Sequence, residues 1–503
     1  DRSHFGSSQG ESMTIGLACW QLPSCLLQIS RQRTLCVSRL LASSDGGVSS
    51  SQTDVLQAVD QRAARPVLQL VPRTNEGSGG DARVSRYVPW VFRREATNLD
   101  ELRSLGQPAQ LATVMSAEGK ELGVAACNLR QGGRTNVNIV ARLLAYNART
   151  SIDKAFFVGQ LQRALQLRSQ LFGSSLHYRL LNAEGDHVPG VLLDRFGDLF
   201  CLHFSSDAME VLFEKDIVAA IREACPSVAT AVVVRYDATP DRLLEQSQTI
   251  GRPPQIKTED KQVSGEVIFD LRDDTLASRS SLDLTKSLRY SIDLLSETLL
   301  DPGRPYADSP VRGLALSALP RLAALRKTSI SSLRVLSFFG DSAAMSCALH
   351  GASCSFAEGL GAIQKEHLQR LATLNGCESH VDFIHLSSAQ QLPADSQSAY
   401  DMVMLEPPPL APTYARLERG MQQYVGWVKA AAESLRSKGV LIVVCRSRAM
   451  STTNMLRCIN MGLWAAKRRA AIYHHTASAP FGFPTAAAIP DSKEFQLLAL
   501  RVE

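Results

Sequence analysis

The residues with the clearest potential for chemistry lie at the end of a short apolar run, 400–405. Glu406 ends this run, and Pro407 and Pro408 follow it. Residues 403–405 show too little polar alternation for a half-exposed strand, which favours a parallel strand covered on both faces. Prolines cannot extend a strand ladder, and ligands bind at the carboxyl ends of strands in open α/β sheets. We therefore expect the functional site to lie near Glu406.

A second group of residues has the order of a nucleoside site. The turn Phe339-Gly340-Asp341 follows one predicted strand, and Glu358 ends the next. A glycine in the first strand-to-helix turn lets backbone approach a ligand, and an acid after the second strand accepts hydrogen bonds from ribose hydroxyls. The turn has one glycine where two or three are usual, so by itself it is a weak signal.

These residues require a sheet in which strands and helices alternate, and the sequence has this order from Leu333 onwards. The predicted strands are 333–339, 354–358, 381–386, 400–406 and 440–445, with a final strand pair at 465–475 and 495–502. The predicted helices are 343–350, 362–375, 424–438 and one that begins at Ser451. This alternation predicts an α/β fold over 333–503, with a doubly wound, mainly parallel sheet and an antiparallel edge.

Smaller regions precede this sheet. Residues 1–82 contain a linker (43–82) with a short helix at 54–64. Residues 83–150 form a β-rich domain with strands at 109–114 and 137–144 and a turn at Gly132-Gly133. A small α/β domain over 151–302 contains helices 152–172 and 208–223, two strands within 188–204, a strand at 230–235 and a hairpin at 259–273. Residues 303–332 are predicted to be an insertion loop that carries one helix.

Charge is distributed unevenly, although the formal net charge is only +5. Between residues 128 and 179 there are eight cations and one anion, and the cations include Arg142, Arg163 and Arg168. A one-sided basic surface is what binding to phosphate groups requires. A solvated helix face is the alternative.

Composition argues against several other classes of protein. The eleven cysteines contain no Cys-x-x-Cys pair, which argues against a zinc site or a disulfide scaffold. No run approaches the length of a membrane-spanning helix, which needs about 20 apolar residues, so a membrane is not an expected partner. The cysteine spacing means that a metal is not an expected partner either. Residues 13–44 contain no acid and carry Arg31, Arg33 and Arg39. This pattern is typical of a transit peptide, with the mitochondrion as the leading location and the plastid as the alternative; a disordered or partner-bound extension is the other interpretation.

Several runs resemble one family when they are taken together. Residues 83–92 are similar to the opening of PUA-type RNA-binding domains, and 181–204 closely resembles the LxxGEADGLPGLxVDRYGD run of large-subunit ribosomal-RNA cytosine-C5 methyltransferases. Residues 374–376, 401–408 and Cys445 stand where that family has its LNG, DPP and SCS motifs. The resemblance implies a PUA-like domain and a small α/β domain before a Rossmann-like, class I S-adenosylmethionine-dependent domain.

The resemblance implies a donor site. In it, Glu358 would hold the ribose of S-adenosylmethionine, and the turn Phe339–Asp341 would lie beside the donor's amino-acid end. Glu406, with Pro407 and Pro408, would border the methyl group and the target base.

The resemblance also implies a nucleophile and an RNA surface. Cys445 would attack the pyrimidine ring, which requires a thiolate, so a pKa depressed by Arg446 and Arg448 is expected. The cations expected to face RNA are Arg86, Arg142, Arg163, Arg168, Lys467, Arg468 and Arg469.

The chain departs from this pattern at several ligand contacts. Of the family's donor-binding run GQKTGFFLDQR, only Leu282-Asp283 remains, within 275–285. Ser387-Ser388 replace an acid, Glu406 replaces an aspartate, and the terminal DHP run is not recognisable around 477–483. Each lost contact removes about 1–3 kcal/mol of binding energy.

Three functions are therefore weighed. The first is a protein that has lost catalysis and serves, without a cofactor, as an RNA-binding structural or assembly component of an organellar ribosome, with ribosomal RNA and ribosomal proteins as partners. The second is an active rRNA cytosine-C5 methyltransferase that uses S-adenosylmethionine. The third, a small-molecule or protein methyltransferase, would leave the basic segment without a role. Intact folding signals beside altered ligand motifs favour the first.

Overall fold

The computed structural model describes most of the chain from Arg65 onwards. The described residues are 65–72, 83–129, 139–173, 175–226, 231–236, 254–258, 265–271, 286–296, 301, 303–358, 365–386, 393, 396–412, 414–447, 449–477, 483–488 and 495–503. The chain divides into two compact units, 1–61 and 62–503, and all of these residues belong to the second. The predicted features that lie outside the described residues are the transit segment, the helix at 54–64, the turn at Gly132-Gly133, the run at 275–285 and Ser387-Ser388.

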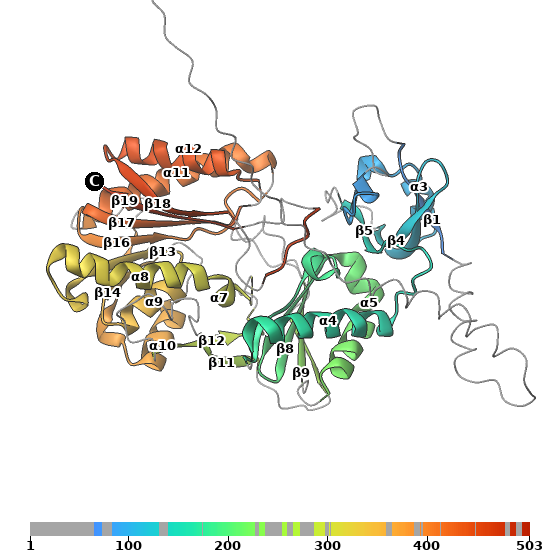
Figure 1. The fold of residues 1–503 in the computed structure, drawn as a ribbon, viewed down its shortest axis with the longest axis horizontal. Helices are drawn as coiled ribbons and strands as arrows, with labels where there is room; N and C mark the ends of the chain where they lie inside the picture. The colour runs from blue at the N-terminus through green and yellow to red at the C-terminus, as the bar shows by residue number, and fades with distance from the viewer. Residues whose placement is uncertain are drawn as a thin grey trace, which may run out of the picture. The chain divides into compact units, whose positions relative to one another are not determined.

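A five-stranded sheet forms the first folded region (Figure 1). Its order is β1-β3-β4-β5-β2, from β1 (Val67–Gln69), β2 (Trp90–Phe92), β3 (Ala109–Met115), β4 (Glu121–Asn128) and β5 (Ile139–Ala145), with helices η2 (Arg93–Glu95) and α3 (Leu99–Ser104). The strands predicted at 109–114 and 137–144 are confirmed as β3 and β5. The predicted start at residue 83 is too late, because Leu68 and Leu70 are fully buried in this region's core and β1 pairs with β3.

A second five-stranded sheet with two helices follows. Its order is β10-β9-β8-β7-β6, from β6 (His177–Asn182), β7 (Val191–Phe196), β8 (Leu199–Phe204), β9 (Ala231–Tyr236) and β10 (Gln255–Thr258), with helices α4 (Lys154–Phe172), η3 (Ala183–Asp186) and α5 (Asp207–Ala224). The Asp153 side chain accepts a hydrogen bond from the Phe156 N–H and starts α4, and Gly173 at φ +57° ends it. The predicted helices and strands of this region are confirmed as far as β9.

The hairpin predicted at 259–273 is wrong. β11 (Glu266–Leu271) pairs instead with β12 (Leu288–Asp293), in an antiparallel register. Phe269 and Leu271 of β11 and Leu288, Tyr290 and Ile292 of β12 are buried in the same core as the C-terminal sheet. This pair of strands therefore packs with the C-terminal domain rather than belonging only to the middle region.

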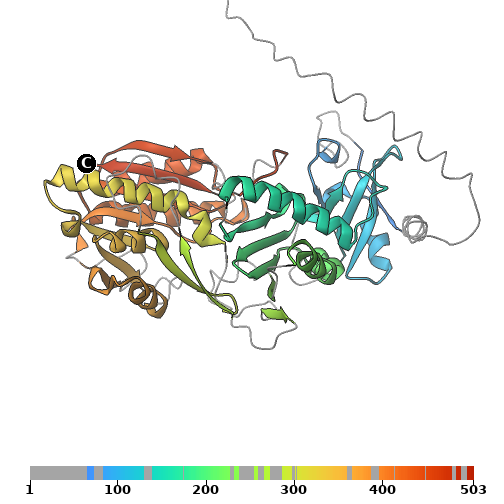
Figure 2. The same ribbon diagram turned by 60° about the horizontal axis from the view of Figure 1, so that its bottom comes forward.

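The helix predicted within 303–332 is confirmed, but the insertion loop predicted to carry it is wrong. This segment forms α7 (Arg304–Ala307), α8 (Ser309–Arg326) and η5 (Ile330–Ser332). α8 buries Val311, Leu316 and Leu319 in the core of the C-terminal sheet, because its Leu and Ala residues recur at helical spacing. Figure 2 shows α8, in yellow, lying along that sheet.

The C-terminal sheet has seven strands in the order β15-β14-β13-β16-β17-β19-β18. The strands are β13 (Arg334–Phe338), β14 (Ser353–Glu358), β15 (Val381–His385), β16 (Tyr400–Leu405), β17 (Leu435–Cys445), β18 (Ala470–Thr476) and β19 (Gln496–Val502). The helices are α9 (Ser342–Leu349), α10 (Lys365–Asn375), η6 (Glu378–His380), η8 (Tyr414–Arg416), α11 (Leu417–Ser434) and α12 (Thr452–Ala465). β13 to β17 are parallel, and β19 is antiparallel to both of its neighbours, as predicted.

Two helical layers cover this sheet. α8, α9 and α10 bury their apolar side chains on one face, together with Met402 and Met404 of β16. α11 and α12 cover the other face, together with Val403 and Leu405. The continuous apolar run of β16 is therefore explained by burial on both faces.

The described residues contain no helix that is long and apolar enough to cross a membrane. They also contain no cluster of three or more His, Cys, Asp or Glu side chains arranged to hold a metal ion.

Candidate functional site

The site lies where β13 and β16, neighbouring parallel strands, reach their carboxyl ends. The Glu406 N–H donates to the carbonyl of Phe338 at 3.0 Å, which holds Glu406 beside the turn after β13. Phe339 in this turn has φ +66°, a left-handed conformation that is costly for a bulky residue. A Cβ at Gly340 would lie 2.1 Å from Oε1 of Glu406. Any larger residue at 340 would therefore force the Glu406 carboxyl group to move.

Glu406 is a buried acid without a hydrogen-bond partner. Its side chain is almost fully buried, and among the described residues neither carboxyl oxygen accepts a hydrogen bond. Nη2 of Arg446 lies 4.0 Å from Oε2 of Glu406. Burial, and then the charge of Asp308, raise the pKa of Glu406 to about 8, and the cations Arg304 and Arg446 offset this only in part. The surroundings of Glu406 thus favour its protonated form.

The wall of the site comes from the segment that was predicted to be an insertion. Arg304 donates through Nη2 to the carbonyl of Phe339 at 3.2 Å, and its Nε lies 3.5 Å from Oδ2 of Asp308. Asp308 also pairs with Arg446. Burial lowers the pKa of Arg304, but the nearby carboxylates, Asp308 first, outweigh it and raise the pKa. Sequence reasoning missed these residues, although Asp-Ser-Pro at 308–310 is a helix-start pattern that could have found them.

The Asp341 side chain forms hydrogen bonds with other groups of the protein. Its side chain accepts hydrogen bonds from the Tyr290 hydroxyl at 2.6 Å and from the Ser342 N–H at the start of α9. His367 lies 3.9 Å away. Burial alone would raise the pKa of Asp341, but Arg304, His367 and the hydrogen bonds hold it below its usual value. Asp341 therefore carries a fixed negative charge next to Gly340.

The other residues of the predicted donor site have the expected backbone positions. Glu358 ends β14, the neighbour of β13, and pairs there with His385; its side chain lies outside the described atoms. Pro407 is buried and Pro408 is half-buried in the loop after β16.

Cys445 has the properties of a core residue. It ends β17, next to β16, but its side chain is buried in the cluster under α11 and α12, with Tyr424. Burial raises the pKa of the Cys445 thiol, and contacts with Tyr424, Ser447 and Arg446 offset this only in part. The expected depressed pKa is therefore wrong, and Arg448 lies outside the described residues. A neutral thiol facing the core does not meet the requirements of a nucleophile.

The cations predicted to face RNA differ in their exposure. Arg86, Arg163, Lys467 and Arg469 are exposed. Arg142 is half-buried and donates to the Ser206 hydroxyl at 3.1 Å.

Two of the predicted cations serve the fold. The prediction for Arg168 is wrong, because its side chain is fully buried and pairs with both carboxyl oxygens of Asp186, at 2.5 and 2.7 Å. Arg468 donates to the carbonyls of Ala432, Leu435 and Glu503, so its guanidinium joins α11 to the chain's last residue rather than facing RNA.

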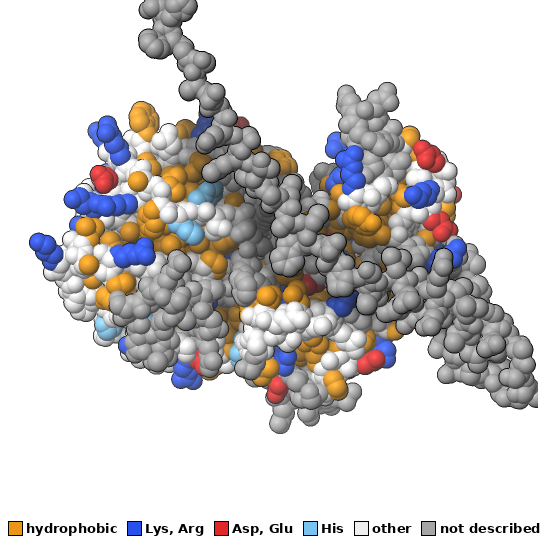
Figure 3. All heavy atoms as spheres, viewed as in Figure 1, with side chains coloured by type: hydrophobic (Ala, Val, Ile, Leu, Met, Phe, Trp, Pro, Cys, Tyr) orange, Lys and Arg blue, Asp and Glu red, His pale blue; other side chains and the backbone are white. Residues whose placement is uncertain are grey.

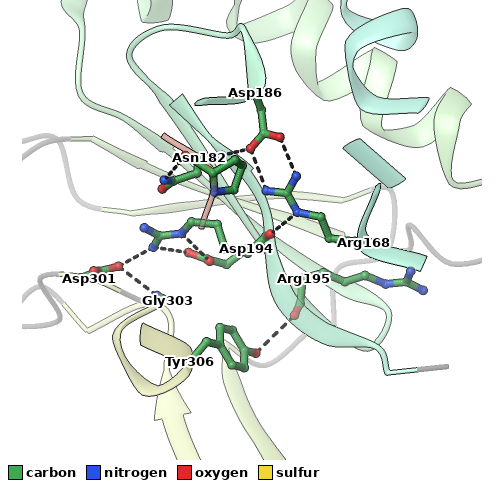
Figure 4. A network of polar contacts seen from close by, with 10 residues as sticks. Arg168, Asn182, Asp186, Asp194, Arg195, Asp301, Gly303 and Tyr306 are labelled. Atoms are coloured by element: carbon green, nitrogen blue, oxygen red, sulfur yellow. Dashed lines mark hydrogen bonds and ion pairs between the residues drawn. The ribbon is translucent and has the colours of Figure 1, made fainter. Parts of the chain in front are cut away.

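Ion pairs connect β6 and β7 to the segment before the site wall (Figure 4). Arg179 donates to both oxygens of Asp194 at 2.9 and 3.0 Å and to Asp301 at 2.5 Å. Burial would raise the pKa of Asp301, but Arg179 holds it below its usual value. Asp301 accepts from the Gly303 N–H at 3.0 Å, just before Arg304. The run that resembles LPGLxVDRYGD thus has a structural role, because its Asp194 helps to position the wall of the site.

The comparisons with known proteins agree with this architecture. No family model matches the chain. Over 154 residues the chain is 30% identical to the ribosomal RNA large subunit methyltransferase I of Pseudoalteromonas translucida, a match that covers 30% of this chain and 36% of that protein. The protein of the same name from Aliivibrio fischeri is 31% identical over 150 residues, 29% of this chain and 35% of that protein. The matched part thus spans about a third of the length of these relatives.

Two solved structures extend the likeness to most of the chain. One is a proposed methyltransferase in complex with S-adenosylhomocysteine (SAH), with a TM-score of 0.63 and 15% identity over 87% of this chain and 100% of that one. The other, a proposed S-adenosylmethionine-dependent methyltransferase from Streptococcus mutans, has a TM-score of 0.61 with the same identity and coverage. At this identity the likeness shows the fold alone. The predicted fold class, a mixed α/β protein with a Rossmann-like methyltransferase sheet, is confirmed.

Proposed function

We propose that this protein binds ribosomal RNA through a methyltransferase fold and acts as a structural or assembly component of an organellar ribosome. The relatives named ribosomal RNA large subunit methyltransferase I support the RNA partner. The observation that carries the loss of C5 chemistry is the burial of Cys445 with a raised pKa. The acid-poor segment at 13–44 supports the mitochondrion, with the plastid as the alternative.

The donor that the fold implies, S-adenosylmethionine, does not fit the described arrangement. A ligand that lies across the turn after β13 must approach Gly340, and the Glu406 carboxyl group occupies the space beside that glycine. The surroundings of Glu406 favour its neutral form, so it offers little attraction to a cationic donor. Asp341 is ionised and would repel a ligand carboxylate placed at this end of the turn. The site therefore favours a protein that has lost donor binding.

One observation favours the alternative, an active S-adenosylmethionine-dependent rRNA methyltransferase. Both oxygens of Glu406 lack a hydrogen-bond partner within the described structure, and a buried polar group without a partner is costly. A positively charged ligand that displaced this side chain would supply the missing partner and lower the pKa of Glu406.

Equilibrium titration with S-adenosylmethionine and SAH separates the two functions. We expect no binding at millimolar ligand at pH 7, together with salt-dependent binding of large-subunit rRNA fragments. The control variant is Glu433→Ala, which changes a partly exposed acid that pairs with Lys429. Micromolar donor binding that Glu406→Ala changes and Glu433→Ala does not, with transfer of a labelled methyl group to rRNA, would establish the enzyme instead. Absence of rRNA binding would overturn the proposed function itself.

A further inference from the structure

The C-terminal sheet has an uncovered edge strand. Among the described strands β18 pairs only with β19, and its residues 471–475 are all exposed. Ile472 and Tyr473 are each 46% exposed, whereas most proteins cover or charge such an edge. A register shift between Ile472 and His474 bulges the strand at Tyr473 and discourages pairing with another strand. This edge is therefore suited to contacts made by side chains rather than to extension of the sheet.

Helix α12 leads into this strand through a short turn, in which the Lys467 N–H donates to the carbonyl of Trp464 at 3.0 Å, and it adds exposed side chains. Arg457, Met461 and Trp464 are spaced by four and three residues, so they lie along one face of the helix. Trp464 is 80% exposed, a large value for a tryptophan, and Met461 is 45% exposed. An exposed stripe of this kind, followed by an exposed strand, marks an interaction surface. We call residues 457–475 the edge platform.

The charge of this segment of the chain has one sign, and an acid from outside it, Glu503, lies beside it, with its N–H donating to the carbonyl of Arg469 at 2.7 Å. From residue 434 to residue 490 the chain has eight Lys or Arg, two His and no Asp or Glu. Within the described residues, Arg457, Lys467 and Arg469 are exposed and form no ion pair with an acid. Figure 3 shows histidine side chains, in pale blue, among hydrophobic and basic side chains over the C-terminal sheet. A polyanionic partner complements such a surface.

The part of the platform before β18, with Lys467 and Arg469, lies at the end of the sheet opposite to Glu406, whereas β18 itself runs back until His475 is level with Leu405. Ala470, the first residue of β18, pairs with Val502, and Val502 pairs with Gly439 near the amino end of the buried part of β17. The site residues lie instead at the carboxyl ends of β13 and β16. A partner held on the platform by Lys467 and Arg469 is therefore held away from the donor end of the sheet.

We propose that the edge platform binds single-stranded RNA, with Trp464 and Tyr473 stacking on bases and with Lys467 and Arg469 contacting phosphates. Exposed aromatic rings beside unpaired cations are the combination that binds single strands without a fixed sequence. Only unpaired bases offer free faces to such rings, so duplex RNA binds more weakly. This inference rests on the proposed function and states which RNA and which surface it uses.

The test measures the affinity of the full chain for a fluorescent single-stranded oligonucleotide, an RNA duplex of equal length and an rRNA fragment. We expect Trp464→Ala to weaken single-strand binding about tenfold, while Trp464→Phe, which keeps a ring that stacks, stays close to wild type. Lys467→Gln with Arg469→Gln should lower the slope of log affinity against log salt by about 1.4. The matched control is Lys215→Gln, an exposed lysine on α5.

The outcomes distinguish the two proposals. If the wild type binds no RNA, the proposed function fails. If the wild type binds RNA and the platform variants bind as the wild type does, only the edge platform is overturned. Equal affinity for duplex and single strand, with equal losses in both, would discard stacking and leave a contact with phosphates alone. RNA binding that is unchanged while Trp464→Ala releases a protein partner would assign the surface to that partner.

Discussion

The buried carboxyl group of Glu406 makes the stability of the protein depend on pH in a specific way. Its pKa rises from 4.5 to about 8 on folding, so the folded state holds a proton that the unfolded state releases between these values. The contribution of Glu406 to stability is therefore fully present below pH 4.5, falls as the pH rises towards 8 and is lost above it. At 1.36 kcal/mol for each pKa unit, the loss is about 5 kcal/mol. Glu406→Gln has no proton to lose, so this loss should be absent in the variant.

The assay is thermal or urea unfolding of wild type and Glu406→Gln at pH 5 and pH 9. We expect similar stability at pH 5 and a variant that is several kcal/mol more stable at pH 9. Titration of the groups that do not interact with Glu406 is common to both proteins and cancels in the difference. Glu433→Gln serves as the control, because Glu433 is partly exposed and pairs with Lys429. An equal difference between variant and wild type at both pH values would refute the argument and mean that Glu406 is ionised in the folded protein.

Two further predictions follow from the buried side chains. Arg168→Ala should destabilise the protein by about 3–5 kcal/mol, because it leaves Asp186 buried without its partner. Arg163→Ala, on the exposed face of the same helix, should change stability by less than about 0.5 kcal/mol. Urea unfolding measures both changes, and equal effects would contradict the burial of Arg168. Cys445 should resist alkylation by iodoacetamide at pH 8 in the folded protein and react after unfolding. Peptide mapping follows the labelling. Rapid labelling of the native thiol would restore Cys445 as a candidate nucleophile.

Much of the C-terminal domain was predictable because its signals are local. The apolar runs of β13, β16 and β17, and the helical spacing of α9 and α10, each lie within one element, so their periodicity appears in the sequence directly. Gly340 and Glu406 were found for the same reason, since both directly follow buried strands. The segment around β11 and β12 was misassigned because its two strands are separated by residues without a turn signal.

The tertiary structure determines which partner each charged side chain has. In the sequence, Arg168 cannot be distinguished from other basic residues on a helix. In the folded structure, β6 and η3 place Asp186 beside it. Arg446 and Asp308 are separated by 138 positions, yet they pair at the site. Whether a cation binds RNA or a buried carboxylate depends on which surface is removed from water, and that depends on contacts between distant segments.

The sequence by itself determined the order of the elements, the end of the sheet where the site lies and the basic character of the chain, because these follow from local periodicity, turn residues and composition. Only the tertiary structure decided that Cys445 faces the core and that Glu406 is buried in surroundings that favour its protonated form. In a strand one position separates the two faces, so the role of a residue at the strand's end depends on register. The pKa of a carboxyl group likewise depends on desolvation and on neighbours that folding brings from other parts of the chain.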